Sequence, residues 1–280
     1  DGTLTARGQC REKQMTKSFG DSVEITFEGR VATVPLDRGD GRNALSLKAM
    51  QALTDAAIFL SQDTEHHTVI LTSTGAFTAG ADLKDPDRAA VSKLSRLEQR
   101  QSLKLGPDMC AAWEALEQIT IAAIEKYCIG GGVALAVACD HRVAGRDAHF
   151  RLPEIPLGMN MSWQTNPRTA ALLGPSRAKQ FTILGEPLAA PLALEWGLVD
   201  EVTDPGTALE AATALAARYA KVPPIALRMT KQSINVATNP LGHATSFMDR
   251  DQVAYASTTS DQREAIQAFL EKRDPAFKGD

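Results

Sequence analysis

The sequence lacks the features that mark several protein classes. Its four cysteines, Cys10, Cys110, Cys128 and Cys139, form no CxxC pair and show no histidine spacing typical of zinc. No uninterrupted apolar run is long enough to span a bilayer, and the N-terminus carries no apolar segment typical of a secretion signal. We therefore expect a cytoplasmic protein in a reducing setting, with no metal site and no membrane partner.

An excess of positive charge is also absent. The formal net charge of the 280 residues is −4, so the sequence predicts no nucleic-acid partner. The hydrophobic fraction of 44% and the charged fraction of 23% are those of an ordinary globular protein. A chain of this length can bury a large core in one or two domains.

The middle of the chain contains a strand, a run of glycines and a helix. Residues 119–124 are apolar and rich in β-branched side chains, which is typical of a buried strand. Gly130, Gly131 and Gly132 follow, and residues 133–139 have the spacing of a buried helix. Backbone N–H groups at such a turn can bind an anion or a developing oxyanion, but the glycines can also serve close packing alone.

Periodicity predicts strands that alternate with helices and then give way to helices only. The expected strands are 23–27, 31–34, 69–73, 119–124, 141–145, 149–152 and 198–202, and the expected helices are 47–60, 103–119, 133–139, 167–173, 175–184, 190–196, 206–219, 223–238, 242–257 and 260–272. Ser46 is a candidate N-cap, and the polar stretch 84–101 is expected to be a mobile surface segment or lid that contains some helix. We predict an unstructured tail or cloning remnant at 1–17, an α/β core at 18–204 and a helical region at 205–280.

Several ordered motifs resemble those of the crotonase (enoyl-CoA hydratase/isomerase) superfamily. They are Arg-Asn-Ala-Leu-Ser at 42–46, Gly-Ala-Phe-Thr-Ala-Gly-Ala-Asp-Leu at 75–83, the glycine run through Cys-Asp at 129–140, Phe-Arg-Leu-Pro-Glu-Ile-Pro-Leu-Gly at 150–158, and 185–199. The resemblance extends from about residue 20 to the C-terminus. It implies a crotonase-like α/β spiral of ββα units with a C-terminal helical trimerisation region. It also implies an acyl-CoA substrate, no cofactor besides that coenzyme A, and a homotrimer or a dimer of trimers.

The resemblance assigns roles to particular residues. The thioester enolate would be held by the backbone N–H groups of Ala81 and Gly131, because such donors stabilise charge as it develops. The CoA and substrate contacts would come from Arg42, Ala44, Ala79, Asp82, Leu83 and Gly130. Phe269 and Lys272 resemble the residues of the family's closing helix that reach the CoA of an adjacent subunit, although Lys272 can equally be a solvated surface charge.

Glu154 is the candidate general base, and a second carboxylate is missing. Hydratases of the family carry another glutamate two residues past the third glycine, where this chain has Ala134. A single carboxylate can move a proton between two carbons, whereas hydration is commonly described with two carboxylates. The sequence therefore favours double-bond isomerisation. A hydratase or related hydrolase with another water-positioning group and a non-catalytic acyl-CoA binder remain as alternatives.

The segment that follows Glu154 departs from the family pattern. Hydratases usually have a glycine-rich Pro-Gly-x-Gly-Gly-Thr-Gln-Arg run here, but residues 159–168 read Met-Asn-Met-Ser-Trp-Gln-Thr-Asn-Pro-Arg. Trp163 is a candidate substrate contact that holds an acyl chain or ring in an altered pocket. Alternatively, Met159, Met161 and Trp163 are ordinary core residues.

Overall fold

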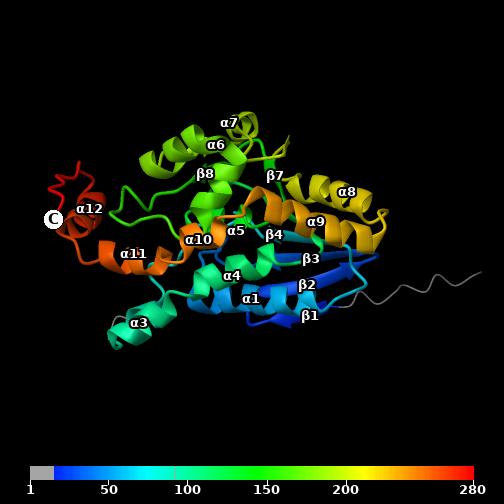
Figure 1. Ribbon diagram of the computed structural model, residues 1–280, viewed down its shortest axis with the longest axis horizontal. Helices are drawn as coiled ribbons and strands as arrows, with labels where there is room; N and C mark the ends of the chain where they lie inside the picture. Colours follow the sequence, from blue (N-terminus) through cyan, green and yellow to red (C-terminus); the bar gives the residue numbers. More distant parts are fainter. Residues whose placement is uncertain (1–15, 92) are drawn as a thin grey trace, which may run out of the picture.

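The computed structural model describes residues 16–91 and 93–280, and it contains a larger and a smaller β-sheet (Figure 1). The larger sheet has the order β1-β2-β3-β4-β5-β7-β10 and the smaller one β6-β8-β9. The strands are β1 (Thr16–Phe19), β2 (Val23–Glu28), β3 (Val31–Leu36), β4 (Thr68–Ser73), β5 (Ile119–Ile124), β6 (Tyr127–Ile129), β7 (His141–Gly145), β8 (His149–Arg151), β9 (Leu188–Ala189) and β10 (Glu201–Thr203).

Helices connect the strands and then form the last part of the chain. They are α1 (Leu47–Ser61), α2 (Pro86–Val91), α3 (Arg96–Ser102), α4 (Leu105–Glu114), α5 (Gly131–Ala136), α6 (Thr165–Leu184), α7 (Ala190–Trp196), α8 (Ala208–Tyr219), α9 (Pro224–Thr238), α10 (Gly242–Ser246), α11 (Asp249–Ala256) and α12 (Ser260–Glu271). This α/β core with a helical C-terminal region confirms the predicted fold class.

The larger sheet is covered on both faces. Strands β3, β4, β5, β7 and β10 pair in parallel, and β5 is buried along its whole length. On one face, α1, α4 and α5 contribute to the main hydrophobic core. On the other face, Ala208, Ala212 and Ala216 of α8 pack against isoleucines of β4 and β5. Helix α8, which the sequence assigned to the helical region 205–280, therefore packs on the core sheet, and the division at residue 204 stays a prediction.

Local sequence signals account for most of these elements. Ser46 caps α1, since its Oγ accepts a hydrogen bond from the backbone N–H of Ala49 at 3.1 Å. Gly174 is non-helical (φ 71°, ψ 163°) and divides α6 just before Pro175, as the predicted break between 173 and 175 requires. The polar stretch 84–101 contains α2 and most of α3, neither of which buries a residue.

Some boundaries differ from the prediction. Thr16 and Lys17 lie in β1, which pairs antiparallel with β2, whereas the sequence placed them in the tail. Most of β1 is exposed, so no apolar alternation marks it as a strand. The rest of the predicted tail, residues 1–15, lies outside the described residues. The helix expected at 242–257 is two helices, α10 and α11, which extend with α12 away from the sheets (Figure 1).

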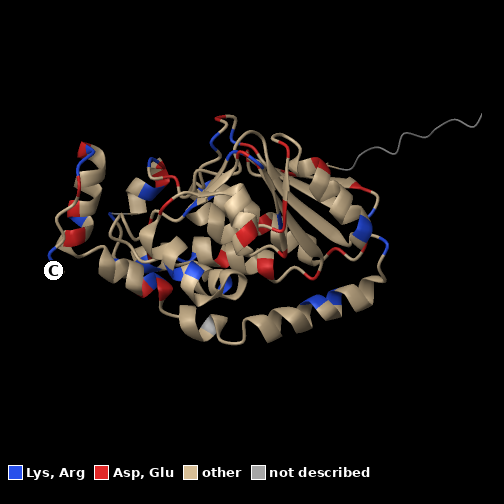
Figure 2. Cartoon of the chain, turned by 90° about the horizontal axis from the view of Figure 1, so that it is seen from above, with Lys and Arg blue, Asp and Glu red and all other residues tan. Residues whose placement is uncertain are grey.

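Acidic and basic residues are interspersed over the surface rather than gathered by sign (Figure 2). Among residues 16–91 and 93–280, none of the helices combines the length and the apolar character that crossing a bilayer requires. The predicted cytoplasmic location stays a prediction.

Candidate active site

The glycine turn between β6 and α5 is fixed by contacts that only glycine permits. Gly130 has a left-handed backbone (φ 53°), and its N–H donates to the carbonyl of Arg151 at 2.8 Å. A Cβ at Gly130 would lie 2.5 Å from Oε1 of Glu154. The turn therefore lies directly against the carboxylate of the candidate base.

A second segment, 77–81, is held beside this turn. The N–H of Ile129 donates to the carbonyl of Thr78 at 3.1 Å, and Thr78 Oγ1 accepts from the N–H of Gly80. A Cβ at Gly80 (φ 82°) would lie 2.5 Å from the carbonyl oxygen of Ile129 and 3.6 Å from the backbone nitrogen of Gly131. This close backbone approach makes the peptides of Ala81 and Gly131 neighbours.

The backbone N–H groups of Ala81 and Gly131 donate to no acceptor among the described residues. Gly131 is buried and Ala81 is partly exposed. Unpaired N–H groups from two adjoining segments can stabilise an oxygen that gains negative charge, because they are held in place before the charge develops. The arrangement can therefore act as an oxyanion hole.

Glu154 is partly exposed as a residue, but one oxygen of its carboxylate is buried and unpaired. Its Oε2 is buried and accepts no hydrogen bond from the described residues. Burial disfavours the charged carboxylate and raises the pKa of Glu154 to about 7. A pKa near neutrality suits a group that takes and returns a proton. Ala134 is fully buried in α5, so the position of the second hydratase glutamate is apolar.

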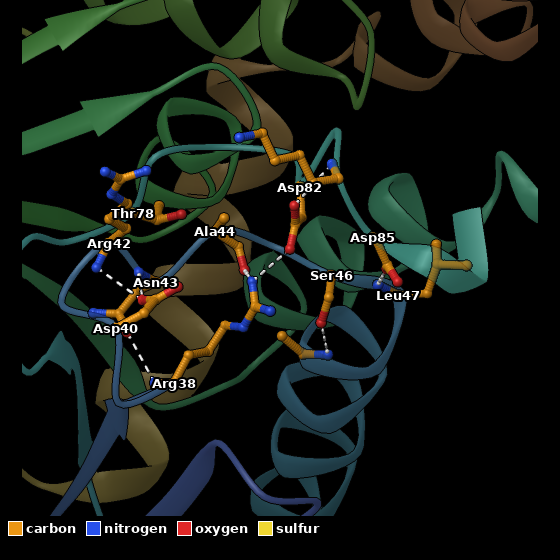
Figure 3. Close-up of polar contacts among 12 residues, drawn as sticks. Arg38, Asp40, Arg42, Asn43, Ala44, Ser46, Leu47, Thr78, Asp82 and Asp85 are labelled. Atoms are coloured by element: carbon orange, nitrogen blue, oxygen red, sulfur yellow. Dashed lines mark hydrogen bonds and ion pairs between the residues drawn. The ribbon is translucent and has the colours of Figure 1, made fainter. Parts of the chain in front are cut away.

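The two segments predicted to contact CoA lie side by side (Figure 3). The N–H of Ala79 donates to the carbonyl of Arg42 at 2.9 Å, and the N–H of Asp82 donates to that of Leu45 at 3.0 Å. Arg38 Nη1 joins them, since it donates to the carbonyl of Ala44 and to Oδ2 of Asp82. The hydrogen bond from Arg38 holds the pKa of Asp82 below its usual range.

Exposed and buried residues alternate in this double segment. Arg42 is exposed, and Leu83 keeps 72% of its surface accessible, so both are open to a large ligand. Asn43 is buried with a left-handed backbone, and its amide donates to the carbonyls of Thr74 and Ala76. Arg38 and Asn43 therefore position the exposed residues.

Trp163 lies at the glycine turn rather than in a remote core. A Cβ at Gly131 would lie 2.4 Å from Cζ3 of the indole, and a Cβ at Gly106 of α4 would lie 2.1 Å from its Cε2. The ring therefore fills the space between α4 and the N-terminus of α5. Trp163 and Gln164 both have left-handed backbones (φ 60° and 57°), so the departure from the glycine-rich family pattern keeps a glycine-like conformation.

Phe269 and Lys272 are placed away from these groups. Helix α12 contacts the site loop at its N-terminal end, where a Cβ at Gly158 would lie 2.5 Å from Cα of Gln262. Phe269 lies seven residues further along, about 10 Å along the helix axis, and 65% of it is exposed. Within this single chain, both residues are open to solvent or to a partner.

A cavity of about 590 Å³ lies at the opposite end of α5, between α5, α6 and α9. Four of its polar residues form two pairs: Lys231 Nζ lies 2.7 Å from Oδ2 of Asp140, and His141 Nε2 lies 2.7 Å from the Tyr219 hydroxyl. Asp140 also accepts a hydrogen bond from the backbone of Thr120, which supports a structural role. Among the described residues, no group of three or more potential ligands could hold a metal ion.

The sequence did not single out several residues that shape this site. They are Arg38, Thr78, Gly80, Gly106 and Arg168. Gly106, next to Pro107 at the start of a predicted helix, had a usable signal, because glycine inside a helix often marks a close approach. Nothing local in the sequence links Arg38 to Asp82 across 44 positions.

Comparison with known proteins shows that the chain is similar to proteins named as enoyl-CoA hydratases. A family model described as enoyl-CoA hydratase/isomerase matches residues 26–280. A short-chain-enoyl-CoA hydratase of Clostridium acetobutylicum is 31% identical over 90% of this chain and 96% of its own. A 2,3-dehydroadipyl-CoA hydratase of Escherichia coli is 32% identical over 91% and 98%. The crystal structure of an enoyl-CoA hydratase from Mycobacterium avium subsp. paratuberculosis superposes with a TM-score of 0.79, at 26% identity over 92% and 98%.

Proposed function

The chain belongs to the enoyl-CoA hydratase/isomerase family, and from this premise we propose that it shifts the double bond of a 3-enoyl-CoA to the 2-position. The observation that carries the proposal is the position of Glu154. Its carboxylate lies against Gly130, next to the unpaired N–H of Gly131, whereas the buried Ala134 replaces the second hydratase carboxylate.

In the proposed reaction, Glu154 in its carboxylate form removes a proton from C2, next to the thioester carbonyl. The electrons form a dienolate, and its oxygen accepts hydrogen bonds from the N–H groups of Ala81 and Gly131. Glu154 then returns the proton to C4, and the double bond lies between C2 and C3. No atom is gained or lost, so no water and no cofactor other than the CoA of the substrate is needed.

Hydration is the second candidate, because the relatives described above are named as hydratases. It would require a group other than Ala134 to orient water beside Glu154. Asp249 and Glu114 are the carboxylates that contact the 159–168 segment, but Asp249 accepts the N–H of Gln164 and Glu114 pairs with Arg168. Neither is hydrogen-bonded to Glu154 among the described residues, so the buried Ala134 is the observation that favours isomerisation over hydration.

The test supplies 3-enoyl-CoA and 2-enoyl-CoA thioesters of several chain lengths side by side. We expect formation of the conjugated 2-enoyl product, seen as a rise in absorbance of the conjugated thioester, and little 3-hydroxyacyl product by mass spectrometry. Hydration of the 2-enoyl thioesters without isomerisation would overturn the proposal. Tight CoA-ester binding without turnover of either class would indicate a non-catalytic binder.

We also propose that copies of the chain associate as a trimer or a dimer of trimers. Helix α12 exposes Ile266, Phe269 and Leu270, whose exposed fractions are 44%, 65% and 74%, and such a row of large apolar side chains is typical of an interface. Lys272 would then approach the CoA of an adjacent subunit. Light scattering should give three or six times the mass of one chain, and a monomer would contradict this assembly.

A further inference from the structure

The indole of Trp163 packs between two glycines that belong to different helices. Gly106 lies within α4 and Gly131 begins α5, and a side chain at either position would collide with the ring. Both glycines are buried, while Trp163 itself is only partly buried. The ring therefore lies between α4 and α5, and the residue as a whole keeps part of its surface accessible.

The backbone of Trp163 is held by hydrogen bonds on both sides of its peptide. Arg168 Nη1 donates to the carbonyl of Trp163 at 2.8 Å, and its guanidinium makes two hydrogen bonds to Glu114 of α4, at 2.9 and 2.8 Å. The next N–H, that of Gln164, donates to Asp249 of α11 at 2.9 Å. Arg168 is 4% exposed, and such enclosed paired contacts hold their geometry.

The ring is close to the place where the thioester would react. Because a Cβ at Gly131 would lie 2.4 Å from the indole, the N–H of Gly131 lies within about 5 Å of the ring by standard backbone geometry. Glu154 lies against the preceding glycine. A substrate whose reacting carbons are bound between Glu154 and the N–H of Gly131 would therefore lie close to the indole.

Trp163 packs against the edge of the main hydrophobic core, but its placement differs from that of a core tryptophan. Trp113 shows what a core tryptophan looks like here: it is fully buried, and its indole N–H donates to the carbonyl of Leu53. The indole N–H of Trp163 has no acceptor among the described residues, and its backbone is left-handed, which favours glycine. A large side chain in this conformation at the oxyanion donor points to a functional constraint.

We propose that Trp163 is the end wall of the acyl pocket and restricts the enzyme to short acyl groups. This inference rests on the proposed function at the same site. The indole lies within about 5 Å of the Gly131 N–H, so an acyl chain that runs from this N–H toward the ring reaches van der Waals contact within its first few carbons. Trp163 is thus a specificity-determining residue for enoyl-CoA thioesters.

The experiment compares kcat/KM for 3-enoyl-CoA substrates of four, six and ten carbons in the wild type, Trp163→Gly and Trp163→Phe. Glycine accepts the left-handed backbone, so the variant opens the pocket without a new backbone conflict. Each methylene that gains an apolar environment adds about fourfold in affinity, so the ten-to-four-carbon ratio should rise at least tenfold in Trp163→Gly and less in Trp163→Phe. The matched control is Trp196→Ala, which removes a tryptophan on α7 and should leave the ratio unchanged.

An unchanged ratio in a folded Trp163→Gly, or in Trp163→Phe if the glycine variant fails to fold, would overturn the proposal. So would a wild type that prefers the ten-carbon substrate. A binding measurement separates this outcome from failure of the proposed reaction: saturated butyryl-CoA and decanoyl-CoA are titrated by calorimetry. If the wild type binds both but turns over no enoyl-CoA, the reaction is wrong, and the change in the ratio of the two Kd values on Trp163→Gly still decides the role of Trp163.

Discussion

Replacing Glu154 with glutamine should lower the turnover rate strongly and also change how stability depends on pH. The change keeps the size of the side chain and removes its ability to take a proton. Loss of a positioned general base typically lowers the rate by about 10²- to 10⁴-fold. Because burial raises the pKa of Glu154 to about 7, the acid limb of kcat/KM in the wild type should lie near pH 7.

The stability effect has a definite sign. A carboxyl with a pKa raised from 4.5 to about 7 binds its proton more tightly in the folded than in the unfolded protein. The free energy of unfolding of the wild type therefore decreases as pH rises from 4.5 through 7, and this contribution is lost above 7. The difference of about 2.5 pKa units corresponds to at most about 3 kcal/mol.

Glutamine at position 154 does not titrate, so the Glu154→Gln variant lacks this decrease. The free energy of unfolding of the variant minus that of the wild type should increase by up to about 3 kcal/mol between pH 5 and pH 8, which for a chain of this size is a shift in Tm of roughly 5 to 10 °C. Urea denaturation at a series of pH values measures it, with Glu195→Gln on the exposed side of α7 as the control.

A difference that stays constant across pH 5 to 8 would refute the reasoning, because it would mean that burial does not perturb Glu154 in the folded protein. The comparison uses the pH dependence rather than the absolute stability, since a buried glutamine amide carries its own desolvation cost. The reasoning would also be refuted if Glu195→Gln showed the same pH dependence of stability as Glu154→Gln. The effect would then come from the loss of one negative charge and not from the burial of Glu154.

Three further changes test the architecture around the site. Gly80→Ala should lower kcat by about 10²- to 10³-fold, because the new Cβ would lie 2.5 Å from the carbonyl oxygen of Ile129 and would displace the N–H of Ala81. Steady-state kinetics measures this loss, and an unchanged circular dichroism spectrum shows that the variant is folded. Arg168→Met leaves Glu114 unpaired but one-third exposed, so it should cost about 1 to 3 kcal/mol by urea denaturation, and no measurable loss would contradict it. Lys231→Met breaks the ion pair with Asp140, which lies outside the site, and should also lower the free energy of unfolding. We expect kcat/KM to stay within about twofold of the wild type. A large loss of activity would argue for a catalytic role of the cavity between α5, α6 and α9.

The individual elements of the fold follow largely from local sequence. The β-branched run of β5 is buried as predicted, and the apolar spacing with Ser46 gives α1 with its capping hydrogen bond. Strand β1 could not be predicted, because its mostly exposed side chains carry no alternation and only pairing with β2 makes it a strand. The 44-residue separation of Arg38 and Asp82 likewise leaves no local signal.

The sequence by itself determined the family, the candidate base and the missing carboxylate, because Glu154 and Ala134 occupy fixed places in linear motifs. Only the tertiary structure decided what surrounds them. Whether Glu154 faces solvent or the Gly130 turn depends on how β6, β8 and the 150–158 loop pack, since burial is a property of contacts far apart in the chain. The same holds for Trp163: the sequence left it between core residue and substrate contact, and its position against Gly106 and Gly131 places it at the turn that holds the oxyanion donor.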